Sequence, residues 1–163
     1  MIELYEGVPG SGKSYHAICE KFLPWVKQGR RLYIAVDGIY LDRLSLFTGI
    51  ELKTLEQQIT IWKDSVEVLQ AFPHVEPGSA VIIDEAQTVF RSMQKVEPGL
   101  LRWLETHRHY GVDILLMSQD FRQMSQGVTR LIEATVKFRK LSFVGLSKKY
   151  QGKVRGNPED NEV

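Results

Sequence analysis

Residues 7–15 read GVPGSGKSY and follow a short apolar segment, IELYE, at residues 2–6. The eight residues from Gly7 to Ser14 match the pattern G-x-x-x-x-G-K-S/T. Small residues at this spacing allow consecutive backbone N–H groups to turn inward around a phosphate chain, and the positive end of a following helix adds to the attraction. The motif stands between an expected strand and an expected helix, which is the context that such a loop requires. The sequence therefore predicts a phosphate-binding loop (P-loop) for a nucleotide.

Each part of this loop has an expected role. Lys13 is expected to reach the β- and γ-phosphates as a point charge, and the Ser14 hydroxyl to ligate Mg²⁺. The alternative is a glycine-rich turn with an incidental lysine, which the strand-and-helix context disfavours. The residues expected to bind ATP are Gly7, Pro9, Gly10, Ser11, Gly12, Lys13, Ser14 and Tyr15.

A second signal is the segment AVIIDE at residues 80–85. An apolar strand that ends in an aspartate is typical of the second magnesium ligand of a P-loop NTPase, so Asp84 is expected to hold Mg²⁺ together with Ser14. Glu85 is expected to polarise an attacking water as a general base. The alternative for Glu85 is that it merely begins a helix, where an acid suits the positive end. Next to a P-loop we favour the catalytic interpretation.

A third signal is the polar pair at the end of the segment VDILLMSQ, residues 112–119. Ligands gather at the carboxyl ends of strands in parallel sheets, so Gln119 is expected to face the nucleotide and to sense the γ-phosphate. A polar strand terminus without a role is the alternative.

The pattern of apolar segments indicates the fold class. Four strand-like segments at 2–6, 31–36, 80–84 and 112–119 alternate with helix-like segments. This alternation predicts an α/β P-loop NTPase fold, a three-layer αβα sandwich with a mostly parallel central sheet. A helix from about Gly12 is expected to kink or stop early at Pro24, and another to run from Pro98 to near Gly111. A helix near 122–132 should lead to a strand at 134–139, and residues 41–78 should mix short helices with turns.

Composition bounds the domain organisation. The chain has 163 residues, of which 43% are hydrophobic and 25% charged, as in a single globular domain. We expect a P-loop domain over 1–145 and a polar tail or linker over 146–163. The net charge of +1 neither supports nor excludes nucleic-acid binding, and the lone Cys19 cannot form an internal disulfide. No apolar run approaches the length of a membrane span.

Several classes of P-loop protein can be separated at this stage. A GTPase of the Ras type needs Asn-Lys-x-Asp, and asparagine occurs only at positions 157 and 161. A small-molecule kinase uses the same loop, but the Asp84–Glu85 pair favours activated water and therefore hydrolysis. A nucleotide-dependent scaffold with little turnover is the third alternative.

The segments GVPGSGKSYHA, PHVEPGSAVIIDEAQ and ETHRHYGVDILLMSQD together resemble the N-terminal domain of the zonula occludens toxin family, which includes the gene I assembly proteins of filamentous phages. The resemblance covers residues 1–145. It implies a Mg²⁺-dependent ATPase domain on the cytoplasmic side of a bacterial inner-membrane protein, with the membrane span outside this chain. It also implies a homo-oligomer, such as a ring, that drives phage extrusion, with phage coat or assembly proteins and phage DNA as partners.

Basic residues near the third signal and near the end of the chain have two interpretations. Arg108, Arg122 and Arg130 are candidates for an arginine finger that acts in trans on the γ-phosphate, although most surface arginines have no such role. Lys148, Lys149, Lys153 and Arg155 form a cluster that suits DNA phosphates or anionic lipid, with a solvated linker as the alternative. His107 and His109 are two residues apart, which favours structural roles over a metal site.

Overall fold

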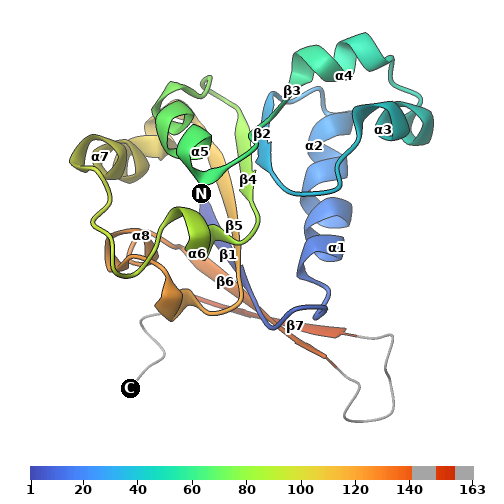
Figure 1. Ribbon diagram of the computed structural model, residues 1–163. Coiled ribbons are helices and arrows are strands. Elements are labelled where there is room, and N and C mark those ends of the chain that lie inside the picture. Colours follow the sequence, from blue (N-terminus) through green and yellow to red (C-terminus); the bar gives the residue numbers. More distant parts are fainter. Residues whose placement is uncertain (141–149, 157–163) are drawn as a thin grey trace.

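A seven-stranded sheet forms the centre of the computed structural model, which describes residues 1–140 and 150–156 (Figure 1). The strand order is β3-β2-β4-β5-β1-β6-β7, with β7 antiparallel to β6 and every other pair parallel. The mostly parallel sheet that the sequence predicts is therefore confirmed. The strands are β1 (Ile2–Glu6), β2 (Leu32–Ala35), β3 (Ile59–Ile61), β4 (Ala80–Ile83), β5 (Asp113–Ser118), β6 (Ala134–Lys140) and β7 (Tyr150–Arg155).

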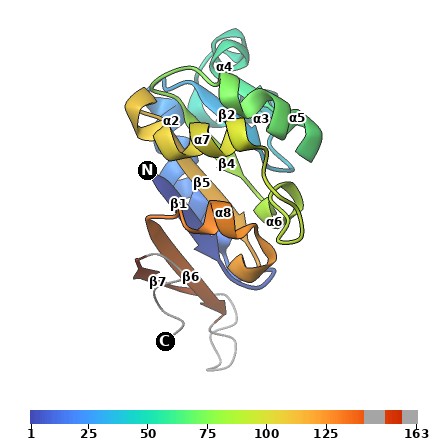
Figure 2. The same ribbon diagram turned by 90° about the vertical axis from the view of Figure 1, so that its left-hand side faces the viewer.

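Helices cover both faces of the sheet and complete a three-layer αβα sandwich (Figures 1 and 2). One layer holds α1 (Lys13–Ala17), the π-helical segment η1 (Ile18–Phe22), α2 (Leu23–Lys27), α3 (Leu41–Thr48) and α4 (Leu52–Gln58). The other holds α5 (Ser65–Ala71), η2 (Phe72–His74), α6 (Ala86–Val89), α7 (Pro98–Thr106), η3 (His107–Tyr110), η4 (Phe121–Gln123) and α8 (Gln126–Thr129).

The strands divide their side chains between two cores because successive residues of a strand point to opposite faces. In β5, Ile114 and Leu116 join the core under α5 to α8, whereas Leu115 and Met117 join the core under α1 to α4. β1 and β4 alternate in the same way. Strands buried on both faces read as continuous apolar runs, which explains why these segments were recognisable in the sequence.

The first helix does not stop at Pro24, which was one of the two predicted outcomes. It continues to Lys27, and the π-helical segment Ile18–Phe22 interrupts its regular α-helical turns just before the proline. A proline removes one backbone N–H donor and crowds the preceding turn, and the wider π-helical turn before Pro24 accommodates both effects. Phe22 and Val26 remain buried on the sheet side of this helix.

Part of the segment that we expected to be a polar tail or linker forms a strand. Residues Tyr150–Arg155 form β7, which pairs along its whole length with β6. The reason is that β6 would otherwise end the sheet with unpaired backbone groups, which a following antiparallel strand satisfies. The remaining part of the expected tail lies outside the described residues, as do Lys148 and Lys149 of the basic cluster.

Two other regions differ from the expected secondary structure: residues 41–78 are more regular, and the helix near 122–132 is shorter. Residues 41–78 contain the expected short helices and also the three-residue strand β3, which pairs with β2. In place of the helix expected near 122–132, the chain forms only the short turns η4 and α8. The helix expected from Pro98 is confirmed as α7, and the turn η3 continues it to Gly111, which has a left-handed conformation.

Among residues 1–140 and 150–156, no helix is long and apolar enough to cross a membrane.

Candidate nucleotide site

The three sequence signals meet at the carboxyl ends of three neighbouring strands. β5 lies between β4 and β1 in the sheet. The P-loop follows β1, Asp84 and Glu85 follow β4, and Gln119 follows β5. The Gly7 N–H donates to the Ser118 carbonyl at 3.2 Å and fixes the start of the loop beside the end of β5. The expected grouping of these residues is therefore present in the fold.

The loop has the backbone conformation that a phosphate cradle needs. Gly10 and Gly12 have φ values of 68° and 96°, which a residue with a Cβ rarely adopts, and Gly12 is the N-cap of α1. Ser11 is buried inside the loop, and its Oγ has no hydrogen-bond partner among the described residues. A buried hydroxyl without a partner is costly, and a phosphate oxygen would satisfy it. The loop thus fits a bound phosphate group.

Gly7 tests how closely the loop packs on the sheet. A Cβ at this position would lie 2.6 Å from the Phe138 carbonyl oxygen and 2.8 Å from Ser11 Oγ. Backbone cannot move aside cheaply, so we expect Gly7→Ala to destabilise the protein by about 1–3 kcal/mol, as overpacking does. Urea unfolding of Gly7→Ala beside Gly156→Ala measures this, because a Cβ at Gly156 meets nothing within 4 Å and its φ lies outside the left-handed region. Equal stability of Gly7→Ala and wild type would contradict the close packing.

Lys13 is buried within the loop that it is expected to serve. Its Nζ donates to the Gly7 carbonyl at 2.6 Å and lies 3.4 Å from the Val8 carbonyl oxygen. Burial lowers the pKa of the ammonium, and the negative charges of Asp84 and Glu85 oppose that shift. The two carboxylates thus favour the charged form that a phosphate contact requires.

Ser14 and Asp84 provide the hydroxyl and carboxylate that a magnesium site needs. Ser14 Oγ donates to Asp84 Oδ2 at 3.1 Å, across 70 residues of sequence. Mg²⁺ is usually held by one or two such side chains together with waters and nucleotide phosphates, not by a protein cage. Residues 1–140 and 150–156 contain no cluster of three or more His, Cys, Asp or Glu side chains able to hold a metal.

Glu85 is held in a strained conformation beside Asp84. Its φ of 47° lies in the left-handed region, and it is the one described non-glycine residue with a positive φ. Its N–H donates to Asp84 Oδ1 at 2.8 Å. Strain of this kind costs about 1–3 kcal/mol and persists where the surroundings fix it, often at functional sites. One tight turn therefore fixes the directions of the Asp84 and Glu85 carboxylates.

Two side-chain amides donate to the Glu85 carboxylate. Gln119 Nε2 lies 3.3 Å from Glu85 Oε2 and 3.5 Å from Oε1, and Gln87 Nε2 also donates to Oε2. Sequence reasoning identified Gln119 but missed Gln87. No signal in the sequence indicates Gln87, because side chains two residues apart on a helix do not face each other and the contact depends on the left-handed turn at Glu85.

A cleft of about 180 Å³ opens beside this carboxylate. Asp37, Asp64, Asp84 and Glu85 line it together with Lys63, so acidic groups dominate its polar lining. The cleft lies between the ends of β2 and β4 and the start of α5. It gives the Glu85 side of the site an entrance from the edge of the sheet that carries β2 and β3.

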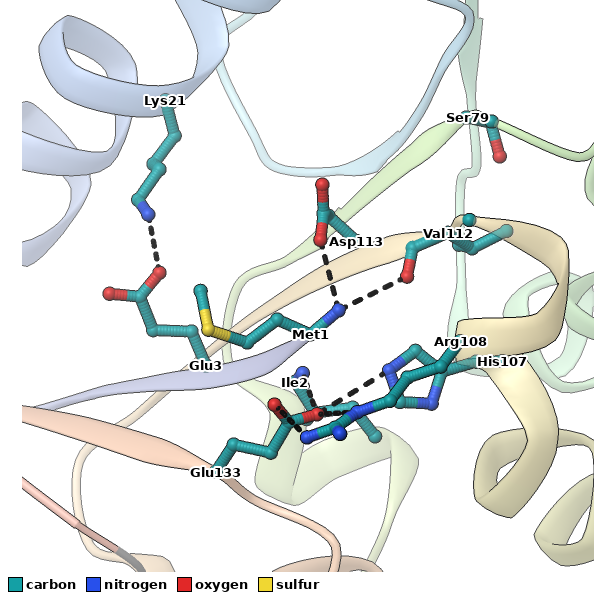
Figure 3. Close-up of polar contacts among 12 residues, drawn as sticks. Met1, Ile2, Glu3, Lys21, Ser79, His107, Arg108, Val112, Asp113 and Glu133 are labelled. Atoms are coloured by element: carbon teal, nitrogen blue, oxygen red, sulfur yellow. Dashed lines mark hydrogen bonds and ion pairs between the residues drawn. The ribbon is translucent and has the colours of Figure 1, made fainter.

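The three candidate arginines lie at different places. Arg122 follows β5 at the P-loop end of the sheet and pairs with Asp120, with Nη2 2.9 Å from Oδ2. Arg130 is exposed after α8. Arg108 lies at the opposite end of the strands, where its guanidinium pairs with Glu133 just before β6 (Figure 3). Tyr15 and Pro9 of the predicted ATP-binding set are exposed on the loop side.

His107 is buried and lies beside Glu133, the acid that also pairs with Arg108 (Figure 3). Its Nδ1 donates to the Leu104 carbonyl at 2.6 Å, and its Nε2 lies 3.7 Å from Glu133 Oε1. Burial lowers the pKa of His107, an effect to which the N-terminal ammonium and Arg108 add and which the Leu104 carbonyl and Glu133 oppose. His107 therefore has the structural role that the sequence favoured over metal binding.

The lowered pKa of His107 makes stability depend on pH. The unfolded chain binds a proton on this histidine near pH 6.5, whereas the folded protein does so only at lower pH. Stability should therefore be full above about pH 7 and should fall as the pH drops below 6.5, by up to about 1.4 kcal/mol per pH unit. Urea unfolding between pH 7.5 and 5.5 measures the slope, which should flatten in His107→Asn but not in His109→Asn. The lowered pKa of Glu133 acts only below its usual value of 4.5, outside this window.

The sheet order, the P-loop between β1 and α1, and the acidic end of β4 define a P-loop NTPase fold. The chain belongs to the zonular occludens toxin (Zot) family, whose model matches residues 1–162. The resemblance seen in the sequence is thus confirmed. One relative is the Gene 1 protein of Xanthomonas phage phiLf, which is 26% identical over 164 residues, or 93% of this chain and 37% of the relative. The chain spans little more than a third of the length of the curated relatives it matches.

Two solved structures show the same fold. The N-terminal domain of zonular occludens toxin from Neisseria meningitidis is 20% identical, with a TM-score of 0.58 over 98% of this chain and 95% of that one. The genome packaging NTPase B204 from Sulfolobus turreted icosahedral virus 2, in complex with ATP-gammaS, is 21% identical, with a TM-score of 0.60 over 90% of this chain and 80% of that one. At these identities the likeness concerns the fold.

Proposed function

We propose that this chain is the ATP-hydrolysing domain of a phage-assembly protein. The observation that carries the proposal is the placement of Lys13 and Ser14 against Asp84 and Glu85, with Ser14 Oγ 3.1 Å from Asp84 Oδ2. A glycine turn with an incidental lysine would not bring a hydroxyl and two carboxylates to one point. A phosphate chain, a magnesium ion and a water need this set of groups.

The residues divide the chemistry as follows. The loop amides and Lys13 hold the phosphates, and Ser14 and Asp84 hold Mg²⁺, which when bound neutralises charge on the β- and γ-oxygens. Glu85 orients water and accepts its proton. Gln119 contacts Glu85 now and reports the γ-phosphate by exchanging that contact for a phosphate oxygen. Both the Mg²⁺ requirement and hydrolysis belong to this proposal.

A neighbouring subunit would complete the site by contributing an arginine. Lys13 is the cation that the loop itself contributes, and transition-state charge on the γ-phosphate favours a further one from an arginine in trans. Arg122 and Arg130 are exposed and lie on the elements after β5, so a ring of copies would present one of them to a neighbour. Arg108 lies at the opposite end of the strands from the P-loop, and this position makes it the weakest of the three candidates.

The comparisons support the assignment to phage assembly. Relatives include a Gene 1 protein of a phage, and a genome packaging NTPase shares the fold. We infer that this domain lies on the cytoplasmic side of an inner-membrane protein, that it forms a homo-oligomer, and that phage coat or assembly proteins and phage DNA are its partners. A P-loop kinase remains the alternative enzyme, and it would transfer phosphate to an acceptor without releasing it.

Phosphate release from ATP, measured with and without Mg²⁺ over a series of protein concentrations, tests the proposal. We expect Mg²⁺-dependent release whose rate per chain rises with concentration, because a finger in trans needs a neighbour. Normal ATP binding with no release at any concentration would replace the proposal by the nucleotide-dependent scaffold.

A further inference from the structure

The β6–β7 hairpin concentrates the positive charge of the chain. Residues 134–156 contain seven lysines and arginines and no aspartate or glutamate, whereas residues 1–133 contain 14 basic and 17 acidic residues. Residues 157–163 add three acidic residues and no basic one, so the net charge of +1 for the whole chain conceals this separation. A strong charge asymmetry of this kind suggests a polyanionic partner for the basic part.

The strand register places three of these cations on one face. Lys137 is directly opposite Lys153, and Arg139 is two residues beyond Lys137 on the same strand. Cross-strand partners share a face, and so do residues two apart. We call Lys137, Arg139 and Lys153 the cationic face. Arg139 and Lys153 are exposed, and neither has an ion pair within residues 1–140 and 150–156.

This arrangement is unfavourable for folding alone. Like charges directly opposite each other destabilise a strand pair. Glu6 relieves this repulsion in part, since its Oε2 lies 3.1 Å from Lys137 Nζ, but no acid of the described residues forms an ion pair with Arg139 or Lys153. A face that keeps uncompensated cations together on an outer pair of strands is suited to an external anion.

The other face of the hairpin shows which anion fits better. Val136 and Phe138 point to the opposite side and are buried in the core under α1 and α2. Among the described residues, the cationic face carries no large apolar side chain that could insert into a bilayer, which membrane-surface binding usually requires, and the exposed Val154 lies on the opposite face with Val136. Figures 1 and 2 show β7 at the outer edge of the sheet, beyond the helical layers. A phosphate backbone needs only such an accessible row of cations.

We propose that the cationic face binds the sugar–phosphate backbone of a nucleic acid. This inference rests on the proposed function, which names phage DNA as a partner, and it adds the surface that contacts the nucleic acid. The contact lies close to the nucleotide site, because Lys137 reaches Glu6 and Glu6 directly precedes Gly7 of the P-loop. A strand bound along β6 and β7 would therefore lie beside the element that holds the phosphates of ATP.

The test measures binding of a fluorescent 20-nucleotide oligothymidylate, and of a 20-base-pair duplex, by anisotropy at several salt concentrations. In Arg139→Glu/Lys153→Glu, we expect affinity for the better-bound probe to fall at least ten-fold. We also expect the slope of log affinity against log salt to become shallower by about 1.4 for the single strand, since each lost phosphate contact removes about 0.7. The matched control is Lys53→Glu/Arg102→Glu, which makes the same charge change at exposed positions on α4 and α7 and should stay within two-fold of wild type.

Three results would overturn the proposal. The first is an equal loss of affinity in the two double variants, and the second is no binding of either probe by the wild-type protein at about 50 mM salt, where phosphate contacts are strong. The third is a loss of affinity that is seen only with phosphatidylglycerol vesicles. The vesicle result would assign the face to lipid. If thermal unfolding shows that the glutamate variant is misfolded, Arg139→Gln/Lys153→Gln replaces it. ATP binding, measured in each variant, should not change, so failure of this inference is distinguishable from failure of the nucleotide site.

Discussion

Lys13→Ala is expected to remove ATP binding almost completely. Lys13 is buried in the P-loop, and its ammonium is the charge that the loop directs at the phosphates. Truncating one partner of a buried, hydrogen-bonded charge pair costs about 2–5 kcal/mol. At tenfold per 1.4 kcal/mol, we expect the affinity for Mg·ATP to fall by about 30-fold to several thousand-fold. Isothermal titration with a slowly hydrolysed ATP analogue measures this loss.

The fold should survive this change, which separates a binding defect from misfolding. The Lys13 side chain donates within its own loop, to the Gly7 and Val8 carbonyls, so its truncation leaves the strand pairing and the two cores intact. Lys27→Ala removes an exposed lysine from the same helical layer and serves as the control. Undiminished affinity in Lys13→Ala, with wild-type thermal unfolding, would mean that the loop is a structural turn.

Sequence reasoning succeeded where a local pattern determines the structure. The P-loop glycines need left-handed backbone and a close approach to the sheet, and those demands appear as a fixed spacing within eight residues. Asp84 and Gln119 were predictable because each ends an apolar segment buried on both faces, and parallel strands bring their carboxyl ends to one edge. The distance between Ser14 and Asp84 follows from that topology.

Features that depend on tertiary contacts were not predictable in the same way. The segment around Pro24 indicates a kink or an early stop, and the packing of Phe22 and Val26 on the sheet favours continuation of the helix. β7 is a short polar segment whose pairing is set by the free edge of β6. The contact of Gln87 with Glu85 depends on a left-handed turn at a non-glycine residue, which no composition rule indicates.

Glu85→Gln is expected to separate ATP binding from hydrolysis. The glutamine keeps the size of the side chain, so the turn at φ 47° and the neighbouring loop should persist, but it cannot accept a proton from water. General-base catalysis contributes about 10²–10⁴-fold, and we expect Mg²⁺-dependent phosphate release to fall by that factor. Affinity for Mg·ATP should stay within a few-fold of wild type, because Lys13, Ser14 and Asp84 are untouched.

The hydrogen bonds of Glu85 allow a second variant, Gln87→Ala, to be compared with Glu85→Gln. Gln87 and Gln119 both donate amide hydrogens to the carboxylate, and a carboxylate that is held by two amides must be released from at least one to meet a water. Gln87→Ala should therefore keep Mg²⁺-dependent release or raise it, whereas Glu85→Gln should lower it by about 10²–10⁴-fold. Glu105→Gln, an exposed acid on α7, is the matched control and should behave as wild type. If Glu85→Gln released phosphate as fast as wild type, the base would have to be another group, and Asp84 would be the nearest carboxylate to test.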